Sequence, residues 1–236
     1  VVIPDDLVPD AALVERLHQY IAGGGAVIVC HNAGLEADSR QSWLTRYGLD
    51  YFGDSEFKPA YMVTDDSFTA DMPGYAWALY DGASQWKEKS PARSLAMLGV
   101  PLFQRSAEHY TSHRQTPFEQ STDYSVLAVS GKVGLAAFPI GESYYEKGYW
   151  IYRSAFQKLL DAVYPHRLIE TNAPLNTEIT MTWQPADHEQ GRRERYIVHL
   201  INWSTSRKTP PHPEVHEDPV ALSDVRLKLN MPLGKV

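Results

Sequence analysis

The stretch GGGAVIVCHNAG, residues 23–34, decides how the first part of this chain folds. Its centre, residues 26–30, is uncharged and apolar on both faces, which is typical of a strand in a parallel sheet covered on both sides. The strand ends in Cys30, the only cysteine of the chain, and His31 and a glycine-bearing turn follow directly. Several enzymes present a nucleophile in this way, so the stretch raises the question of whether Cys30 is one.

The residues before this strand predict a helix. Asp10 can cap its first turn, because the carboxylate accepts from free backbone N–H groups. Its apolar face consists of Leu13, Leu17 and Ile21. The glycines at 23–25 end it, and a second short helix is expected over residues 39–47. Strands and helices that alternate with short connections indicate an α/β domain, which we place at residues 1–165.

The pattern changes after residue 165. Residues 177–183 alternate between apolar side chains and threonines, which is typical of an antiparallel strand. Residues 196–203 and 225–229 also have strand character, with no helix between them. We therefore predict a small antiparallel β module over residues 166–236, with an exposed loop at 204–219.

Composition narrows the classes of function. The chain has 236 residues, 43% of them hydrophobic, which is enough for a substantial core. The net charge of −7 argues against nucleic acid as a partner, and no apolar run is long enough to cross a membrane. One cysteine fits a reducing compartment, so we expect a cytoplasmic protein. The chain lacks an initiator Met and opens within a strand, which indicates a fragment of a longer protein.

A nucleophilic Cys30 would need a base. Strand, cysteine and turn resemble the nucleophile elbow of class I glutamine amidotransferases, in which a histidine follows a late strand. Phe138 occupies the matching place here, and the side chain of His31 should point away from Cys30. A buried structural cysteine is therefore the favoured interpretation. A cysteine-dependent, amidotransferase-like hydrolase that uses Cys30 stays open as the alternative.

The long polar segment 101–122 is the second candidate site. A loop of this length within a compact domain is typically functional or mobile. Its side chains offer hydrogen-bond donors, acceptors and an aromatic ring to a hydroxyl-rich or anionic ligand. The candidate residues are Arg105, His109, Tyr110, His113 and Arg114. A solvated surface loop and an interface loop are the alternatives.

No metal or cofactor is expected. His109 and His113 lack a third ligand nearby, and the pair His212 and His216 lies among prolines that prevent a helix. No glycine-rich phosphate loop follows a strand. The spacing of the remaining acidic residues marks no acid/base pair, so they are interpreted as solvated. These are Asp65, Asp66, Asp71 and Glu142.

Taken in order, several motifs resemble one family over residues 1–230. They are LVPDAALVERLHQYIAGGGAVIVCHNAGLEAD (7–38), FQRSAEHYTSHRQTP (103–117), GLAAFPIGESYYEKG (134–148) and HLINWS (199–204). The set is similar to the β-galactosidase trimerisation domain, in the version found in α-L-fucosidase-like glycoside hydrolases. The resemblance implies a flavodoxin-like, doubly wound and mostly parallel sheet without amidotransferase chemistry.

The resemblance also implies a role. In that family a catalytic (β/α)₈ barrel precedes this domain and holds the two catalytic carboxylates. The expected function is therefore assembly and active-site shaping in a glycoside hydrolase, with no catalytic residue in this chain. The loop from Arg105 to Arg114 would reach over the active site of the barrel, with His109, Tyr110 and His113 as hydrogen-bonding and stacking contacts to sugar. The chain would form a homo-oligomer, either a dimer or a trimer. A plain carbohydrate-binding module is a third hypothesis.

Overall fold

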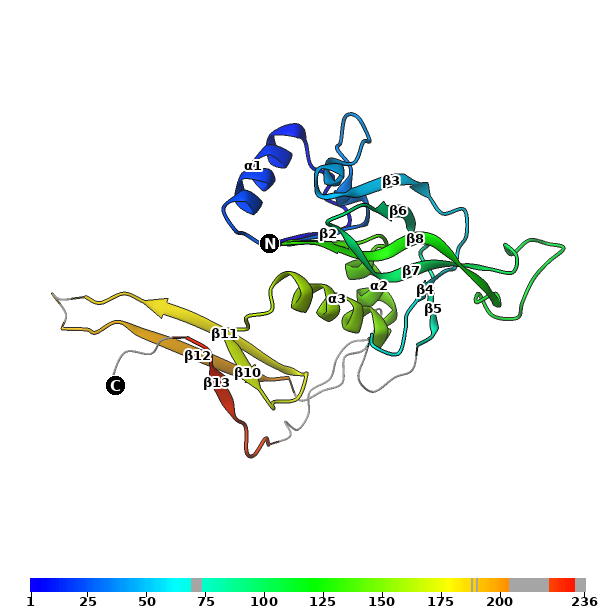
Figure 1. The fold of residues 1–236 in the computed structure, drawn as a ribbon. Coiled ribbons are helices and arrows are strands. Elements are labelled where there is room, and N and C mark those ends of the chain that lie inside the picture. Colours follow the sequence, from blue (N-terminus) through cyan, green and yellow to red (C-terminus); the bar gives the residue numbers. More distant parts are fainter. Residues whose placement is uncertain (69–73, 188, 190, 204–220, 232–236) are drawn as a thin grey trace. The chain divides into compact units, whose positions relative to one another are not determined.

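The computed structural model describes residues 1–68, 74–187, 189, 191–203 and 221–231. Contacts along the chain divide it into two compact units, Val1–Pro165 and His166–Val236 (Figure 1). In the described residues, no helix is long and apolar enough to span a membrane.

Unit 1 contains strands and helices in a mixed order. Its helices are α1 (Ala11–Ala22), α2 (Ile140–Lys147), α3 (Trp150–Val163) and the 3₁₀ helices η1 (His31–Gly34) and η2 (Trp43–Tyr47). Its strands are β1 (Val2–Ile3), β2 (Val27–Cys30), β3 (Leu49–Asp54), β4 (Ala60–Val63), β5 (Ala76–Leu79), β6 (Ser84–Glu88), β7 (Arg93–Pro101), β8 (Phe118–Ser130) and β9 (Val133–Ala136). The α/β class predicted from the sequence is confirmed.

These described strands form one mixed sheet. Its order is β1-β2-β9-β8-β7-β4-β5, and β3 pairs with β6, which joins β8. The expected parallel pairing holds for β1, β2 and β9, where Val29 lies opposite Ile3 and Leu135. The other described pairs are antiparallel. A tight hairpin at Gly131 (φ 57°) joins β8 to β9, and so short a connection permits only antiparallel pairing.

The core lies where the parallel strands meet the helices. All four residues of β2 and all four of β9 are buried, as the uncharged stretch predicts. In Figure 1, α1 lies on one side of these strands and α3 on the other. Helix α3 buries Ile151, Ala155 and Leu159, and it approaches β9 so closely that a Cβ on Gly134 would lie 3.2 Å from Val163.

The first helix matches its sequence signals, whereas the second does not. Asp10 accepts a 2.7 Å hydrogen bond from the Leu13 N–H, as expected of an N-cap. The helix expected over 39–47 is reduced to the 3₁₀ helix Trp43–Tyr47. Arg40 has a positive φ of 55° and so cannot be part of a right-handed helix, which is why the helix does not start at residue 39. The left-handed conformation of Gly48 ends the 3₁₀ helix.

Unit 2 contains two small antiparallel sheets, as predicted for the second module. Strand β11 (Thr177–Gln184) pairs with β12 (Arg195–Asn202), and β10 (Ile169–Thr171) pairs with β13 (Leu227–Leu229). In β11, Ile179 and Met181 are half-buried, while Thr180 and Thr182 are exposed. The expected loop at 204–219 lies outside the described residues.

Candidate functional site

The polar segment forms the tip of a two-stranded arm. Residues 102–117 connect β7 to β8, and Figure 1 shows them projecting beyond the ends of those strands. The outer part of β8 is mostly exposed and its inner part, from Ser125, is buried. Several register shifts interrupt the β7–β8 ladder. Such bulges increase local twist, so they set the direction in which the arm points.

The base of the loop is tied to the sheet. The N–H of Leu102 donates a 2.9 Å hydrogen bond to the carbonyl of Pro117. The hydroxyl of buried Tyr61, on β4, donates to the carbonyl of Thr116. The Tyr61 ring also packs edge-on against Phe118, with ring centroids 5.4 Å apart. The loop therefore starts from a fixed position although its tip is exposed.

Hydrogen bonds within the loop hold its shape. Ser106 closes a turn, because its N–H donates to the His109 carbonyl at 2.8 Å and its hydroxyl accepts from the His109 N–H at 3.1 Å. The Arg105 guanidinium donates to the Thr111 carbonyl at 3.3 Å. The Thr111 hydroxyl in turn donates to the His113 carbonyl at 2.6 Å.

The structure separates the five candidate residues into two groups. His113 and Arg114 line a cavity of about 720 Å³ at the side of the loop. Arg105, His109 and Tyr110 are not among its lining residues. All five side chains are exposed, and Tyr110 reaches 74%. Two of the five candidates thus share a concave surface, whereas the other three present their side chains elsewhere on the loop.

The sequence did not identify the other residues that line this cavity, among them Tyr80 and Gln115. Tyr80, which directly follows β5, lines it, and its hydroxyl lies 3.4 Å from the Gln115 side-chain oxygen. Gln115 also borders an adjoining cavity of about 500 Å³, where Tyr61 and Tyr75 contribute aromatic rings. The sequence signal that could have identified Tyr80 is its position directly after an apolar strand. Only the fold brings it beside the loop.

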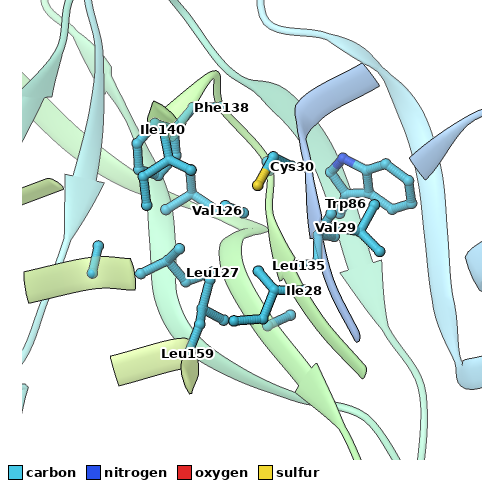
Figure 2. Close-up of a cluster of buried hydrophobic side chains, with 14 of the residues drawn as sticks. Ile28, Val29, Cys30, Trp86, Val126, Leu127, Leu135, Phe138, Ile140 and Leu159 are labelled. Atoms are coloured by element: carbon cyan, nitrogen blue, oxygen red, sulfur yellow. The ribbon is translucent and has the colours of Figure 1, made fainter. Parts of the chain in front are cut away.

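The second candidate, Cys30, lies within the core. Figure 2 draws Cys30 within a cluster of buried hydrophobic side chains that also contains Ile28, Val126 and Leu159. The residue is 3% exposed. Burial, with a smaller contribution from the Asp5 carboxylate, raises the pKa of the thiol to about 12. None of the hydrogen bonds described in the structure involves this thiol. These features oppose a nucleophilic thiolate.

The turn after Cys30 also differs from a nucleophile elbow. The strained backbone belongs to His31 (φ 44°), whereas Cys30 is extended with φ −111°. Burial lowers the pKa of His31, which is half-buried. Phe138, at the place of the amidotransferase histidine, is 1% exposed and packs against Tyr152. Position 138 therefore supplies no histidine to the sulfur, and no described hydrogen bond links His31 to it.

Two of the acidic candidates, Asp65 and Asp66, accept local hydrogen bonds. Asp65 accepts hydrogen bonds from the backbone and hydroxyl of Ser67 at 2.8 and 2.6 Å, and Asp66 accepts from the Gly74 N–H at 2.6 Å. Within the described ranges, no group of three His, Cys, Asp or Glu residues is placed to hold a metal ion. Asp71, His212 and His216 lie outside those ranges.

The chain consists of a mixed α/β unit followed by small β sheets, and comparison with solved structures finds a similar fold. An α-L-fucosidase, isoenzyme 2 from Paenibacillus thiaminolyticus, matches 98% of this chain with a TM-score of 0.82 and 23% identity. The match covers 34% of that protein, so the chain spans about a third of the fucosidase's length. The chain therefore has the fold of that part of the fucosidase.

Two further structures are more distant. A β-galactosidase from Rahnella sp. R3 has a TM-score of 0.46 at 12% identity, over 85% of this chain and 32% of its own. A ThuA-like protein from Bacteroides uniformis has a TM-score of 0.44 at 12% identity, over 69% and 67%. Neither similarity is strong enough to support an argument. No family model matches the sequence, and comparison with curated proteins also gives no match.

Proposed function

We propose that this chain is an accessory, non-catalytic region of a glycoside hydrolase whose catalytic carboxylates lie in a barrel domain outside these 236 residues. The main support is the fold, which corresponds to about a third of an α-L-fucosidase over nearly the whole of this chain. In this proposal unit 1 is a flavodoxin-like, doubly wound domain of the β-galactosidase trimerisation type. Its parallel strands and the helices on both sides of them are consistent with that assignment.

The arm gives this region a means of shaping an active site. Its tip presents imidazole, guanidinium and phenol groups to solvent, and these groups donate to and accept from sugar hydroxyls. His113 and Arg114 lie beside Tyr80 and Gln115 in one concave surface. We infer that this surface contacts the sugar bound in the barrel, and that Arg105, His109 and Tyr110 contact the barrel or the more distant part of the substrate.

Kinetics on the longer protein test this role. The parent protein, with its upstream sequence, should hydrolyse 4-nitrophenyl α-L-fucoside or β-D-galactoside, whereas the 236-residue chain alone should not. In the parent, His113→Ala and Arg114→Ala should each raise KM about tenfold, the usual effect of losing a charged or polar sugar contact. Lys132→Ala, in the exposed β8–β9 turn, is the matched control.

The possible outcomes separate cleanly. Hydrolysis by the 236-residue chain itself would contradict a non-catalytic role. Unchanged KM and kcat in both loop variants, relative to Lys132→Ala, would remove the loop from the active site while leaving the accessory role intact.

Assembly is the second part of the proposal. We expect a homodimer or homotrimer, because the resembled domain type packs subunits together. Light scattering during size-exclusion chromatography of the parent protein measures this directly. A strictly monomeric parent protein over a wide concentration range would exclude it.

A further inference from the structure

A second cavity adjoins the concave surface of the arm. Its volume is about 500 Å³, and it lies beside the end of β4 and the start of β5. It shares Gln115 and Pro117 with the cavity of about 720 Å³ that His113, Arg114 and Tyr80 line. We call the larger one the polar cavity and the smaller one the aromatic cavity. Because they share two lining residues, the two cavities are neighbouring parts of one groove.

Aromatic rings rather than charges line the aromatic cavity. Tyr61, Tyr75 and Phe118 contribute the rings, and none of the described residues that line it is charged. The polar cavity, by contrast, includes the His113 imidazole and the Arg114 guanidinium. An uncharged aromatic lining favours a neutral ligand with apolar surface and offers no partner to a phosphate or a carboxylate.

The exposed rings of the aromatic cavity are held in place. Tyr75 is 61% exposed, and its ring packs edge-on against Trp77 with centroids 5.2 Å apart. The Thr64 N–H donates a 2.9 Å hydrogen bond to the Tyr75 carbonyl, and the Thr64 hydroxyl accepts one from the Trp77 indole at 3.1 Å. The ring of Phe118 packs on that of buried Tyr61. An exposed ring that is already ordered loses little conformational freedom when a ligand stacks on it.

A pyranose ring matches this combination of features. Its C–H groups form an apolar face that packs on an aromatic ring, while its hydroxyls remain in contact with water or with polar side chains. Gln115 lies where the two cavities meet, with its side-chain oxygen 3.4 Å from the Tyr80 hydroxyl. Its amide group carries donors and an acceptor for the hydroxyls of either sugar. Both cavities have the volume of ordinary small-molecule sites, so each has room for one sugar unit.

We propose that the aromatic cavity is a second sugar subsite, in which a neutral pyranose stacks on Tyr75 while the sugar linked to it occupies the polar cavity. The ligand is then a neutral oligosaccharide rather than a simple glycoside. This inference rests on the proposed function in taking the polar cavity to contact sugar. It adds the second sugar and the side chain that recognises it.

Binding of 2′-fucosyllactose to the 236-residue chain tests the proposal. This trisaccharide contains both fucose and galactose, each linked to a further pyranose, and methyl α-L-fucoside and methyl β-D-galactoside are the single-sugar controls. We expect the trisaccharide to bind at least about tenfold tighter than either methyl glycoside, since stacking of one more ring on an aromatic side chain contributes about that factor. Ligand-observed NMR titrations measure all three affinities.

Three variants locate the effect. Tyr75→Ala removes the stacking ring, so the advantage of the trisaccharide should fall to about twofold or less, whereas Tyr75→Phe keeps the ring and should keep the advantage. Tyr145→Ala removes a ring of similar exposure, 59%, on α2 and outside both cavities, and should change nothing. Equal affinity of the trisaccharide and the methyl glycosides for the wild-type chain, or no binding of any of them, would overturn the proposal even if Tyr75→Ala fails to fold. An advantage that persists in Tyr75→Ala would also overturn it.

A failure of this subsite is distinct from a failure of the proposed function. The subsite is judged by binding to the 236-residue chain, which requires no hydrolysis. The proposed function is judged by hydrolysis of the 4-nitrophenyl glycosides by the parent protein and by this chain alone. A parent protein that hydrolyses them while the chain binds no trisaccharide would therefore exclude only the second subsite.

Discussion

The reactivity of Cys30 toward alkylating reagents distinguishes a buried structural thiol from a nucleophile. Its pKa rises from 9.0 to about 12 on burial. This rise lowers the thiolate fraction at pH 8 about 1,000-fold, because each pKa unit is a factor of ten. A more basic thiolate is intrinsically more nucleophilic, so the rate constant of the thiolate itself rises about 15- to 30-fold and offsets part of the lower thiolate fraction. The net chemical effect is a rate about 30- to 60-fold below that of an ordinary thiol, and exclusion of the reagent by the core lowers it further.

The assay follows iodoacetamide labelling by mass spectrometry in the native chain and in urea. Native Cys30 should react at least about 30-fold more slowly than the same residue in the unfolded chain. Ser106→Cys places a second thiol on the exposed loop as an internal control. If native Cys30 reacts as fast as this introduced thiol, the inference that Cys30 is structural is refuted and the amidotransferase-like alternative gains support.

The same shift gives a pH dependence of stability. The thiol ionises at pH 9.0 in the unfolded chain and at about 12 in the folded one. Between these values the unfolded state binds fewer protons, so stability is fully present below pH 9.0 and is lost as the pH rises. Relative to Cys30→Ala, the wild-type chain should lose up to about 1.4 kcal/mol per pH unit in this window. Parallel stability curves for the two proteins would contradict the shift.

Three further predictions concern stability, measured by urea unfolding. Leu159→Ala should cost about 2–5 kcal/mol because this side chain is fully buried, while Leu102→Ala, which is exposed, should stay within about 0.5 kcal/mol; equal effects would contradict the core assignment. Burial raises the pKa of Asp81, but hydrogen bonds, including that from Lys147, lower it overall below 3.8. The advantage of wild type over Asp81→Asn should therefore exist near pH 6 and fade as the pH falls below 3.8, and a constant difference would refute this. Tyr61→Phe should cost about 1 kcal/mol by removing the hydroxyl at the loop base, and no loss would show that this hydrogen bond is unimportant.

Local signals explain which parts of the fold could be predicted. The N-cap at Asp10 and the apolar stretch at 26–30 each indicate an element without help from distant residues. Strand β6 lacked such a signal, because Ser84–Glu88 is mostly polar. It is a strand because its backbone pairs with β3 and its Trp86 is buried in the core. The polar outer half of β8 was interpreted as loop for the same reason. It is extended because its backbone pairs with β7.

The candidate site was predictable in its chemistry but not in its geometry. The polar composition of the loop made His113 and Arg114 candidates, yet nothing local distinguishes them from His109 or Arg105. The difference arises from Tyr80, which the antiparallel sheet brings beside one side of the loop only. For Cys30 the sequence alone was informative, because position 138, where an amidotransferase would have its histidine, holds phenylalanine.

Because β7 and β8 form a long two-stranded ribbon, changes in strand length during evolution can alter how far the loop projects from the sheet. Its strands have 9 and 13 residues, and beyond Leu127 toward the tip β8 no longer pairs with β9. Inserting two residues into each strand would advance the tip by about 7 Å while every side chain keeps its face. Gaining or losing a bulge would instead re-aim the tip. Related chains can thus match differently sized neighbours through ribbon length alone, with the packed interior left untouched.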